Sequence, residues 1–222
     1  MNLKSILKRS YHTFFTRVIP NDSRELKNAI GDSRSLLDVG CGESSPIRSF
    51  SKQIYCVGVD AHKLSIEKSK KQGIHNQYFC MDILNLNKRF KEKSFDCVLA
   101  SDVIEHFEKE EGLKLIKAME KIAKRKVIIF TPNGFLPQQE YGGNRLQEHK
   151  SGWTVIEMEK LGYKVIGING WKALRDKLSL LKYRPYYFWL IVSDITQLFT
   201  RNHPSYAFQL LCVKNIDHLG SK

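Results

Sequence analysis

Short apolar runs alternate with helix-like segments from Ser35 onward, and this alternation constrains the fold more than any other feature. Strands are expected at residues 36–39, 54–59, 77–81, 95–100 and 126–131, with helical stretches at about 45–52, 62–72 and 103–124. Two further strands are expected at residues 163–168 and 206–213. Such alternation is typical of βαβ units, in which right-handed crossovers join parallel strands. The sequence therefore predicts an α/β domain built on a largely parallel sheet.

Two helices are expected before the first strand. Apolar residues recur at helical spacing over residues 3–19, and Pro20 ends that segment. Asp22 or Ser23 can cap a second, shorter helix that runs through Ile30.

The first strand runs directly into a glycine turn. The run at residues 36–39 contains Asp38, and Gly40-Cys41-Gly42 follows it. Glycines are needed where a ligand approaches the backbone closely, because a side chain would block that approach. A helix after the turn would present free N–H groups to the same ligand. The turn and the acid before it predict the start of a nucleotide-binding core.

Acidic residues also end the second and third strands. Asp60 follows Asp38 by 22 residues, a spacing at which an acid can bind both ribose hydroxyls of an adenosine. Asp82 follows Asp60 by another 22 residues, where its carboxylate can accept from an adenine amine while Ile83 packs on the ring. Each acid could instead cap the turn or helix after it. Three acids at successive strand ends on one sheet edge nevertheless favour a shared ligand.

Composition favours an anionic partner and a reduced protein. Lysine and arginine number 36 against 23 acidic residues, which gives a net charge of +13. Such a charge attracts nucleic acid, acidic lipid or a phosphorylated small molecule. The alternative is that the lysines are spread over a solvated surface.

The five cysteines form no C-x-x-C pair, and four lie in or beside apolar runs. They are expected to be reduced core residues, so that neither a disulfide framework nor a metal site is predicted.

The chain resembles class I methyltransferases that use S-adenosyl-L-methionine (SAM). The resemblance rests on four features in this order: the glycine turn after Asp38, Asp60, Asp82, and the stretch Val103-Ile104-Glu105-His106 after the fourth strand. The similarity is to the broad group with a D-x-G-C-G loop and a V-I-E-H stretch, the methyltransferase type 11/12-like proteins. It covers roughly residues 35–168. It implies a Rossmann-like, doubly wound sheet of seven mostly parallel strands, with an antiparallel last strand and helices on both faces.

The resemblance also divides the chain and assigns cofactor-binding residues. It implies a single SAM-binding domain made of a helical cap at 1–34, a Rossmann-like core at 35–168, a helical insert at 169–205 and a last strand at 206–214. The residues expected around the methionine part, the ribose, the adenine and the cleft wall are Asp38, Gly40, Cys41, Gly42, Asp60, Ala61, Asp82, Ile83, Ser101 and Val103. The run Glu43-Ser44-Ser45-Pro46 departs from the small, glycine-containing run often found after the second glycine, although Pro46 suits a first helical turn.

The resemblance implies an enzyme that transfers a methyl group from SAM to a small molecule, or to a glycan or lipid intermediate, with oxygen as the expected acceptor atom. A methyltransferase acting on RNA and a non-catalytic SAM-binding subunit stay open as alternatives. A NAD-dependent dehydrogenase is disfavoured, because its G-x-G-x-x-G/A fingerprint requires a glycine or alanine at the position where this chain has Ser45.

His106 and His149 are the candidate catalytic bases, if the acceptor must lose a proton. Histidine titrates near neutrality, with an unperturbed pKa of about 6.5. His106 follows the fourth strand, and His149 lies in the polar segment after the fifth strand, which the fold brings to the same edge. Each could instead orient its own turn or loop.

The insert mixes aromatic and basic residues at 171–202, which suits an anionic or amphiphilic acceptor or the surface of a membrane. Together with the N-terminal helices it is expected to form a cap over the acceptor side. The run at residues 186–192 is too short to span a bilayer, and the N-terminus has no secretory pattern. The protein is therefore expected in the cytoplasm, with peripheral membrane contact as one alternative and the oligomeric state left open.

Overall fold

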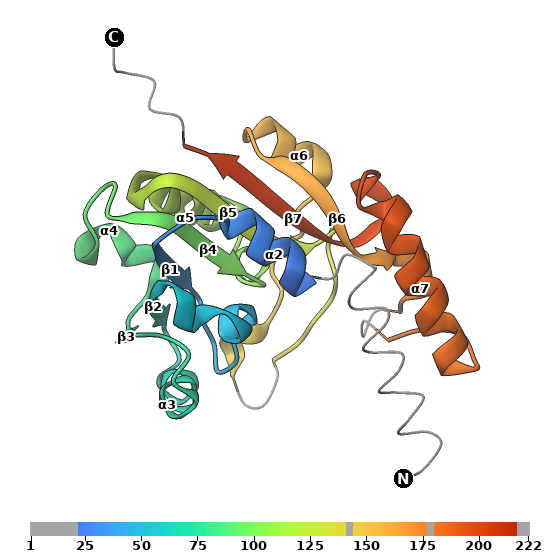
Figure 1. The fold of residues 1–222 in the computed structure, drawn as a ribbon, viewed down its shortest axis with the longest axis horizontal. Coiled ribbons are helices and arrows are strands. Elements are labelled where there is room, and N and C mark those ends of the chain that lie inside the picture. The colour runs from blue at the N-terminus through green and yellow to red at the C-terminus, as the bar shows by residue number, and fades with distance from the viewer. Residues whose placement is uncertain (1–21, 141–143, 177–179, 217–222) are drawn as a thin grey trace.

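The computed structural model describes residues 22–140, 144–176 and 180–216, which form one sheet with helices packed on it (Figure 1). The helix expected at residues 3–19 lies outside them. The strands are β1 (Ser35–Val39), β2 (Tyr55–Asp60), β3 (Gln77–Cys80), β4 (Phe95–Ser101), β5 (Ala123–Pro132), β6 (Lys164–Trp171) and β7 (Ala207–Asn215).

The strand order in the sheet is β3-β2-β1-β4-β5-β7-β6. The strands β1 to β5 are parallel, and β7 lies between β5 and β6, antiparallel to both. The predicted seven-stranded, mostly parallel sheet with an antiparallel last strand is confirmed. From β1 the chain builds outward to β3 and then returns to β4 on the other side of β1. Ligands of open α/β sheets bind at such a reversal, outside the carboxyl ends of the strands.

The described helices are α2 (Asp22–Ile30), α3 (Lys63–Gln72), α4 (Leu86–Arg89), α5 (Lys109–Ile122), α6 (Val155–Lys160) and α7 (Tyr186–Thr200). Short 3₁₀ turns lie at Pro46–Ser49, Ser51–Gln53, Ile83–Asn85, Ile104–His106, Arg145–Gln147, Lys172–Leu174 and Pro204–Tyr206. None of the helices in the described ranges is long and apolar enough to cross a membrane.

Two apolar clusters hold the helices against the sheet. One contains Leu115 and Met119 of α5, and the other contains Leu26 of α2. Leu36 belongs to the second cluster and Leu37 to the first, as the alternation of side chains across a strand requires. The sheet is therefore covered on both faces, which leaves the ends of its strands as the place for a ligand.

Residues that typically end or begin helices mark two helix boundaries. The helix α2 begins at Asp22 and is followed by Gly31, whose φ of +60° is the left-handed conformation that ends many helices. Thr154 and Glu157 form a capping box at the start of α6, where each side chain accepts from the other residue's backbone N–H.

Two of the predicted helices were wrong in form. The segment at 45–52 forms two 3₁₀ turns, because three residues per turn place Ile47 and Phe50 on one side, where both are buried. The segment at 103–124 is divided into a 3₁₀ turn and α5. The chain is extended at Phe107 and Glu108 between them. The carbonyl oxygen of Glu105 accepts from the backbone of the segment after β5 and not from a helix of its own.

Candidate cofactor and acceptor site

The glycine turn after β1 is bound to the end of β2. The N–H groups of Gly40 and Cys41 donate to the carbonyl of Val59 at 2.8 and 3.0 Å, and the N–H of Gly42 donates to Asp60 Oδ2 at 2.8 Å. Both glycines have positive φ, +69° at Gly40 and +56° at Gly42. This conformation suits glycine and brings the turn's backbone against the acid that ends the neighbouring strand.

The two glycines differ in what a side chain would meet. A Cβ on Gly40 would stand 2.5 Å from Cγ2 of Val103, which is too close for any side chain. A Cβ on Gly42 would have no heavy atom within 4 Å, so the backbone there is open to the cavity that it lines. Gly40 thus allows the turn to pack against Val103, which follows β4, and Gly42 leaves space for a ligand.

Asp38 is buried at the end of β1 and forms a hydrogen bond with a histidine that sequence reasoning missed. Nε2 of His75 lies 2.8 Å from Asp38 Oδ2, and both side chains are almost inaccessible. Gly58 makes room for this pair, because a Cβ there would lie 3.0 Å from both the His75 ring and Cys41 Sγ. The pairing gives Asp38 a fixed orientation beside the turn, although 37 residues separate the two partners.

Asp60 and Asp82 both accept hydrogen bonds from the chain that follows them. Asp60 Oδ1 accepts from the N–H of His62 at 2.7 Å. Asp82 accepts from the N–H of Leu84 at 2.9 Å and from the side chain of Asn85 at 2.8 Å, so that it caps a 3₁₀ turn. Each carboxylate oxygen has more than one lone pair, so these bonds fix the two acids in place without excluding a ligand.

Two adjoining cavities lie at the carboxyl ends of the strands, and every cofactor-binding residue expected from the sequence lines one or both. These residues are Asp38, Gly40, Cys41, Gly42, Asp60, Ala61, Asp82, Ile83, Ser101 and Val103. One cavity has apolar walls from Ile83, Phe107 and Leu146, and the other is lined by polar groups around the glycine turn. This division fits SAM, which has a flat adenine at one end and a charged amino acid at the other.

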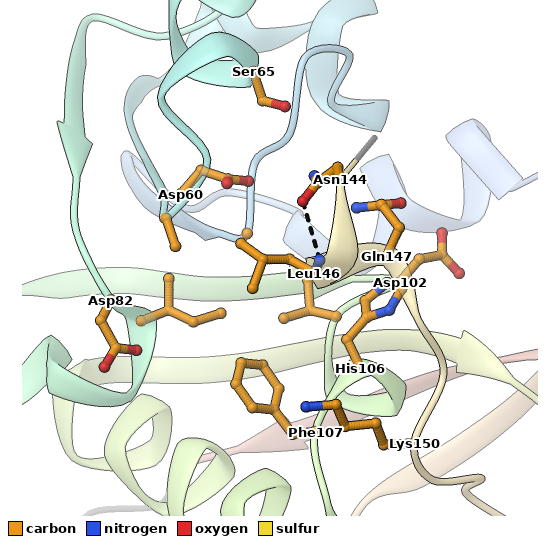
Figure 2. Close-up of a pocket in the computed structure, with 14 residues that line it drawn as sticks. Asp60, Ser65, Asp82, Asp102, His106, Phe107, Asn144, Leu146, Gln147 and Lys150 are labelled. Atoms are coloured by element: carbon orange, nitrogen blue, oxygen red, sulfur yellow. Dashed lines mark hydrogen bonds between the residues drawn. The ribbon is translucent and has the colours of Figure 1, made fainter. Parts of the chain in front are cut away.

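The loop after β5 covers the apolar cavity. Asn144, Leu146 and Gln147 project over it between Asp60 and His106, and Lys150 lies beside Phe107 (Figure 2). The sequence does not single out Asn144, Leu146, Gln147 or Lys150, because only the fold brings this segment back to the end of β4.

Asp102 is a further residue of the cleft that was not predicted as part of the site. It follows β4 with a φ of +52°, which is unusual for a residue other than glycine, and it lines both cavities. Desolvation by the surrounding protein raises the pKa of Asp102 to about 6, against hydrogen bonds from Ser101 and Gln209 that favour the charged form. Asp102 therefore lies where the two cavities adjoin, held by hydrogen bonds from Ser101 and Gln209.

The candidate catalytic histidines lie together, with ring centroids 4.9 Å apart. His106 lines the apolar cavity, whereas His149 is buried behind it and lines neither cavity. Nδ1 of His106 lies 3.1 Å from the carbonyl oxygen of Glu148, and Nδ1 of His149 lies 2.6 Å from that of Leu136. Burial lowers the pKa of both rings, which favours their neutral forms.

Glu105 is fully buried beside the two histidines. Its Oε2 accepts from Thr131 Oγ1 at 3.1 Å, and its backbone carbonyl accepts from the N–H groups of Lys150 and Ser151. Burial and the nearby charge of Asp102 raise the pKa of Glu105 well above its usual range. Glu105 therefore holds the loop after β5 against the end of β4 and places a carboxyl group next to both imidazoles.

Comparison with known proteins agrees with this geometry. A family described as "Methyltransferase domain" matches residues 37–131. A SAM-dependent methyltransferase from Archaeoglobus fulgidus is similar in structure, with a TM-score of 0.57 at 15% identity over 96% of this chain and 100% of the other. The methyltransferase domain of bacterial CtHen1 matches with a TM-score of 0.53 at 19% identity over 86% and 94% of the two chains.

The plantazolicin methyltransferase BpumL, solved with S-adenosylhomocysteine (SAH), is also similar, with a TM-score of 0.51 at 18% identity over 96% of this chain and 90% of the other. At these identities the solved structures show the shared fold. No curated protein matches the sequence. The family match spans β1 to β5, whose ends form the cofactor cleft. The chain therefore resembles class I SAM-dependent methyltransferases in its fold, in the methyltransferase-domain match over residues 37–131 and in the residues that line its cleft.

Proposed function

We propose that this enzyme transfers the methyl group of SAM to a hydroxyl oxygen of a small anionic or amphiphilic acceptor, such as a glycan or lipid intermediate. The observation that carries the proposal is the position of His106, which lines the cavity that also contains Asp60 and Val103. SAM carries its methyl group on a sulfonium. The acceptor oxygen attacks the methyl carbon, the C–S bond breaks, and SAH leaves with the bonding electrons. A hydroxyl acceptor must also give up its proton.

The side chains beside His106 suit an acceptor of this kind. Burial lowers the pKa of both imidazoles and so favours the neutral form, in which one ring nitrogen accepts a hydrogen bond. Lys150 and Gln147 line the same cavity and offer donors for an anionic or hydroxylated acceptor. His106 would contact the hydroxyl directly. His149, whose ring packs against the His106 ring, would hold that ring in place. Asp60 and Ala61 would bind the ribose, and Asp82 and Ile83 the adenine.

An acceptor screen with methyl-labelled SAM tests the proposal. Sugars, lipid-linked intermediates and RNA are incubated separately with the protein, and the labelled product is identified by mass spectrometry. We expect label on a hydroxyl oxygen of a sugar or lipid intermediate. Label on RNA would support the RNA-directed alternative in its place. SAM binding without transfer to any class would favour the non-catalytic subunit.

A second surface favours contact with anionic lipid, and it centres on α7, which lies beside β6 (Figure 1). The helix turns its polar side inward: Gln197 bonds to the backbone of Gly167 and Gly170. The Cα of Gly167 is packed against the carbonyl of Thr200, where a Cβ would clash. Large apolar side chains face outward as a result, at Tyr183, Tyr186, Tyr187, Phe188, Ile195, Leu198 and Phe199.

Exposed basic residues adjoin this apolar surface. Lys182 and Arg184 are exposed just before the start of α7, and Lys172 is exposed directly after β6. Apolar side chains flanked by lysine and arginine are typical of helices that lie in the interface of an anionic membrane. The described part of the insert contributes no lining residue to the two cavities. These residues therefore give no support to the predicted cap over the acceptor side. We propose that the insert contacts a membrane instead.

Vesicle co-sedimentation should show this contact. At low salt the protein is expected to sediment with phosphatidylserine vesicles, and Phe188→Asp with Leu198→Asp should reduce the bound fraction several-fold, because charge replaces two exposed apolar groups. Leu64→Asp is the matched control, since Leu64 is equally exposed but lies on α3. A wild-type protein that stays in the supernatant, or equal loss in the control, would rule out the proposed contact.

A further inference from the structure

The cluster of Glu105, His106 and His149 has the composition and spacing of a metal site. One carboxylate oxygen of Glu105 and one ring nitrogen of each histidine all lie within 4.8 Å of one another. Two imidazoles and one carboxylate are a common ligand set for catalytic divalent metals, and they leave coordination positions open. The expectation of no metal site rested on the cysteines and did not address these residues.

Glu105 gives an independent reason to place a cation here. Its side chain is 1% exposed, and its Oε1 atom has no hydrogen-bond partner among the described residues. Buried polar atoms are nearly always paired, because an unpaired one has lost its water without compensation. A cation between the carboxylate and the imidazoles would give Oε1 that partner.

The histidines are also held in the way that metal ligands usually are. One nitrogen of each ring is hydrogen-bonded to a main-chain carbonyl, of Glu148 for His106 and of Leu136 for His149. A metal-bound histidine typically donates its second N–H to a carbonyl or carboxylate in this manner, which fixes both the ring and its tautomer. Each ring therefore keeps its orientation before any ion arrives.

We propose that Glu105, His106 and His149 bind one divalent transition-metal ion at the wall of the acceptor cavity. The two imidazoles suit ions such as Fe²⁺ or Zn²⁺, and the carboxylate also suits Mn²⁺, whereas Ca²⁺ takes oxygen ligands. His106 is the member that lines the cavity, so the ion lies at the cavity wall. Its use in catalysis rests on the function proposed above: with one ring nitrogen of His106 on the Glu148 carbonyl and the other on the ion, the ion in place of the imidazole would hold the acceptor hydroxyl and lower its pKa.

Titration with MnCl₂, followed by the electron paramagnetic resonance signal of free Mn²⁺, tests the site on the full chain. Mn²⁺ is chosen because it does not favour the thiolates of the five cysteines. We expect one bound ion per chain. Glu105→Gln keeps the shape of the side chain, and we expect it and His149→Ala to weaken binding at least roughly 10- to 100-fold, the loss typical even for residues that only support a ligand.

His203→Ala is the control, because this exposed histidine stacks on Phe199 and belongs to no cluster with Glu105. It should bind Mn²⁺ like the wild type. No binding by the wild type, or unchanged binding by both cluster variants, would overturn the site. A parallel SAH titration separates the two proposals: SAH binding without Mn²⁺ binding contradicts the metal site alone, and Mn²⁺ binding without SAH binding contradicts the proposed function alone.

Discussion

Replacing Gly40 with alanine is expected to destabilise the protein and to lower its affinity for SAM by at least tenfold. The added Cβ would stand 2.5 Å from Cγ2 of Val103, whose side chain is buried and forms part of the cavity wall. The φ of +69° adds backbone strain of about 1–2 kcal/mol, and overpacking of this kind costs a further 1–3 kcal/mol or so. Thermal unfolding and SAH calorimetry measure the two effects.

Gly42→Ala is the matched control for this substitution. It has a similar positive φ of +56° but open space around the new Cβ, so only the backbone strain should reduce its stability. Val103→Ala in the Gly40→Ala background should recover part of the lost stability, because it removes the atoms that clash. If Gly40→Ala and Gly42→Ala were equally stable, the contact with Val103 would not be what requires a glycine at position 40.

Alanine at His106 or His149 is expected to lower turnover by roughly 100-fold or more while SAM affinity is kept. A positioned base typically contributes about 10²- to 10⁴-fold to a rate. Loss of a metal ligand would reduce turnover as well, and the Mn²⁺ titration distinguishes that role. Initial rates on the acceptor found in the screen, set beside SAH calorimetry, measure the effect. The control is again His203→Ala, and near-normal turnover in both histidine variants would show that catalysis rests on positioning alone.

The strands and the residues at the carboxyl ends of β1 to β4 that line the cleft could be predicted because their signals are local. An apolar run, a glycine turn and an acid at a strand end each occupy a few consecutive residues. Parallel strands then bring Asp38, Asp60 and Asp82 to one edge whatever the details of packing. The positions of these residues around the cavities agree with that expectation, and their individual roles toward SAM stay predictions.

The remaining parts of the site depend on contacts between distant segments. Nothing near His75 in the sequence indicates that it pairs with Asp38, and Glu105 reads as one acid in a turn until Lys150 and Ser151 fold onto it. The same is true of the outward apolar face of α7. Its sequence predicts an amphipathic helix, but the glycines of β6 decide that the polar side is the buried one.

Isothermal titration calorimetry can show whether the cleft at the ends of β1 to β4 binds SAM. We expect saturable binding of SAM and SAH to the wild type. Asp60→Ala should weaken that binding by roughly 10- to 100-fold, because a carboxylate hydrogen bond contributes about 1.5–3 kcal/mol. Asp32→Ala, which removes an exposed acid paired with Arg125 on the surface, should bind like the wild type. Unchanged affinity in Asp60→Ala would remove that residue from the site, and a wild type that binds neither SAM nor SAH would show that the cleft is not a SAM site.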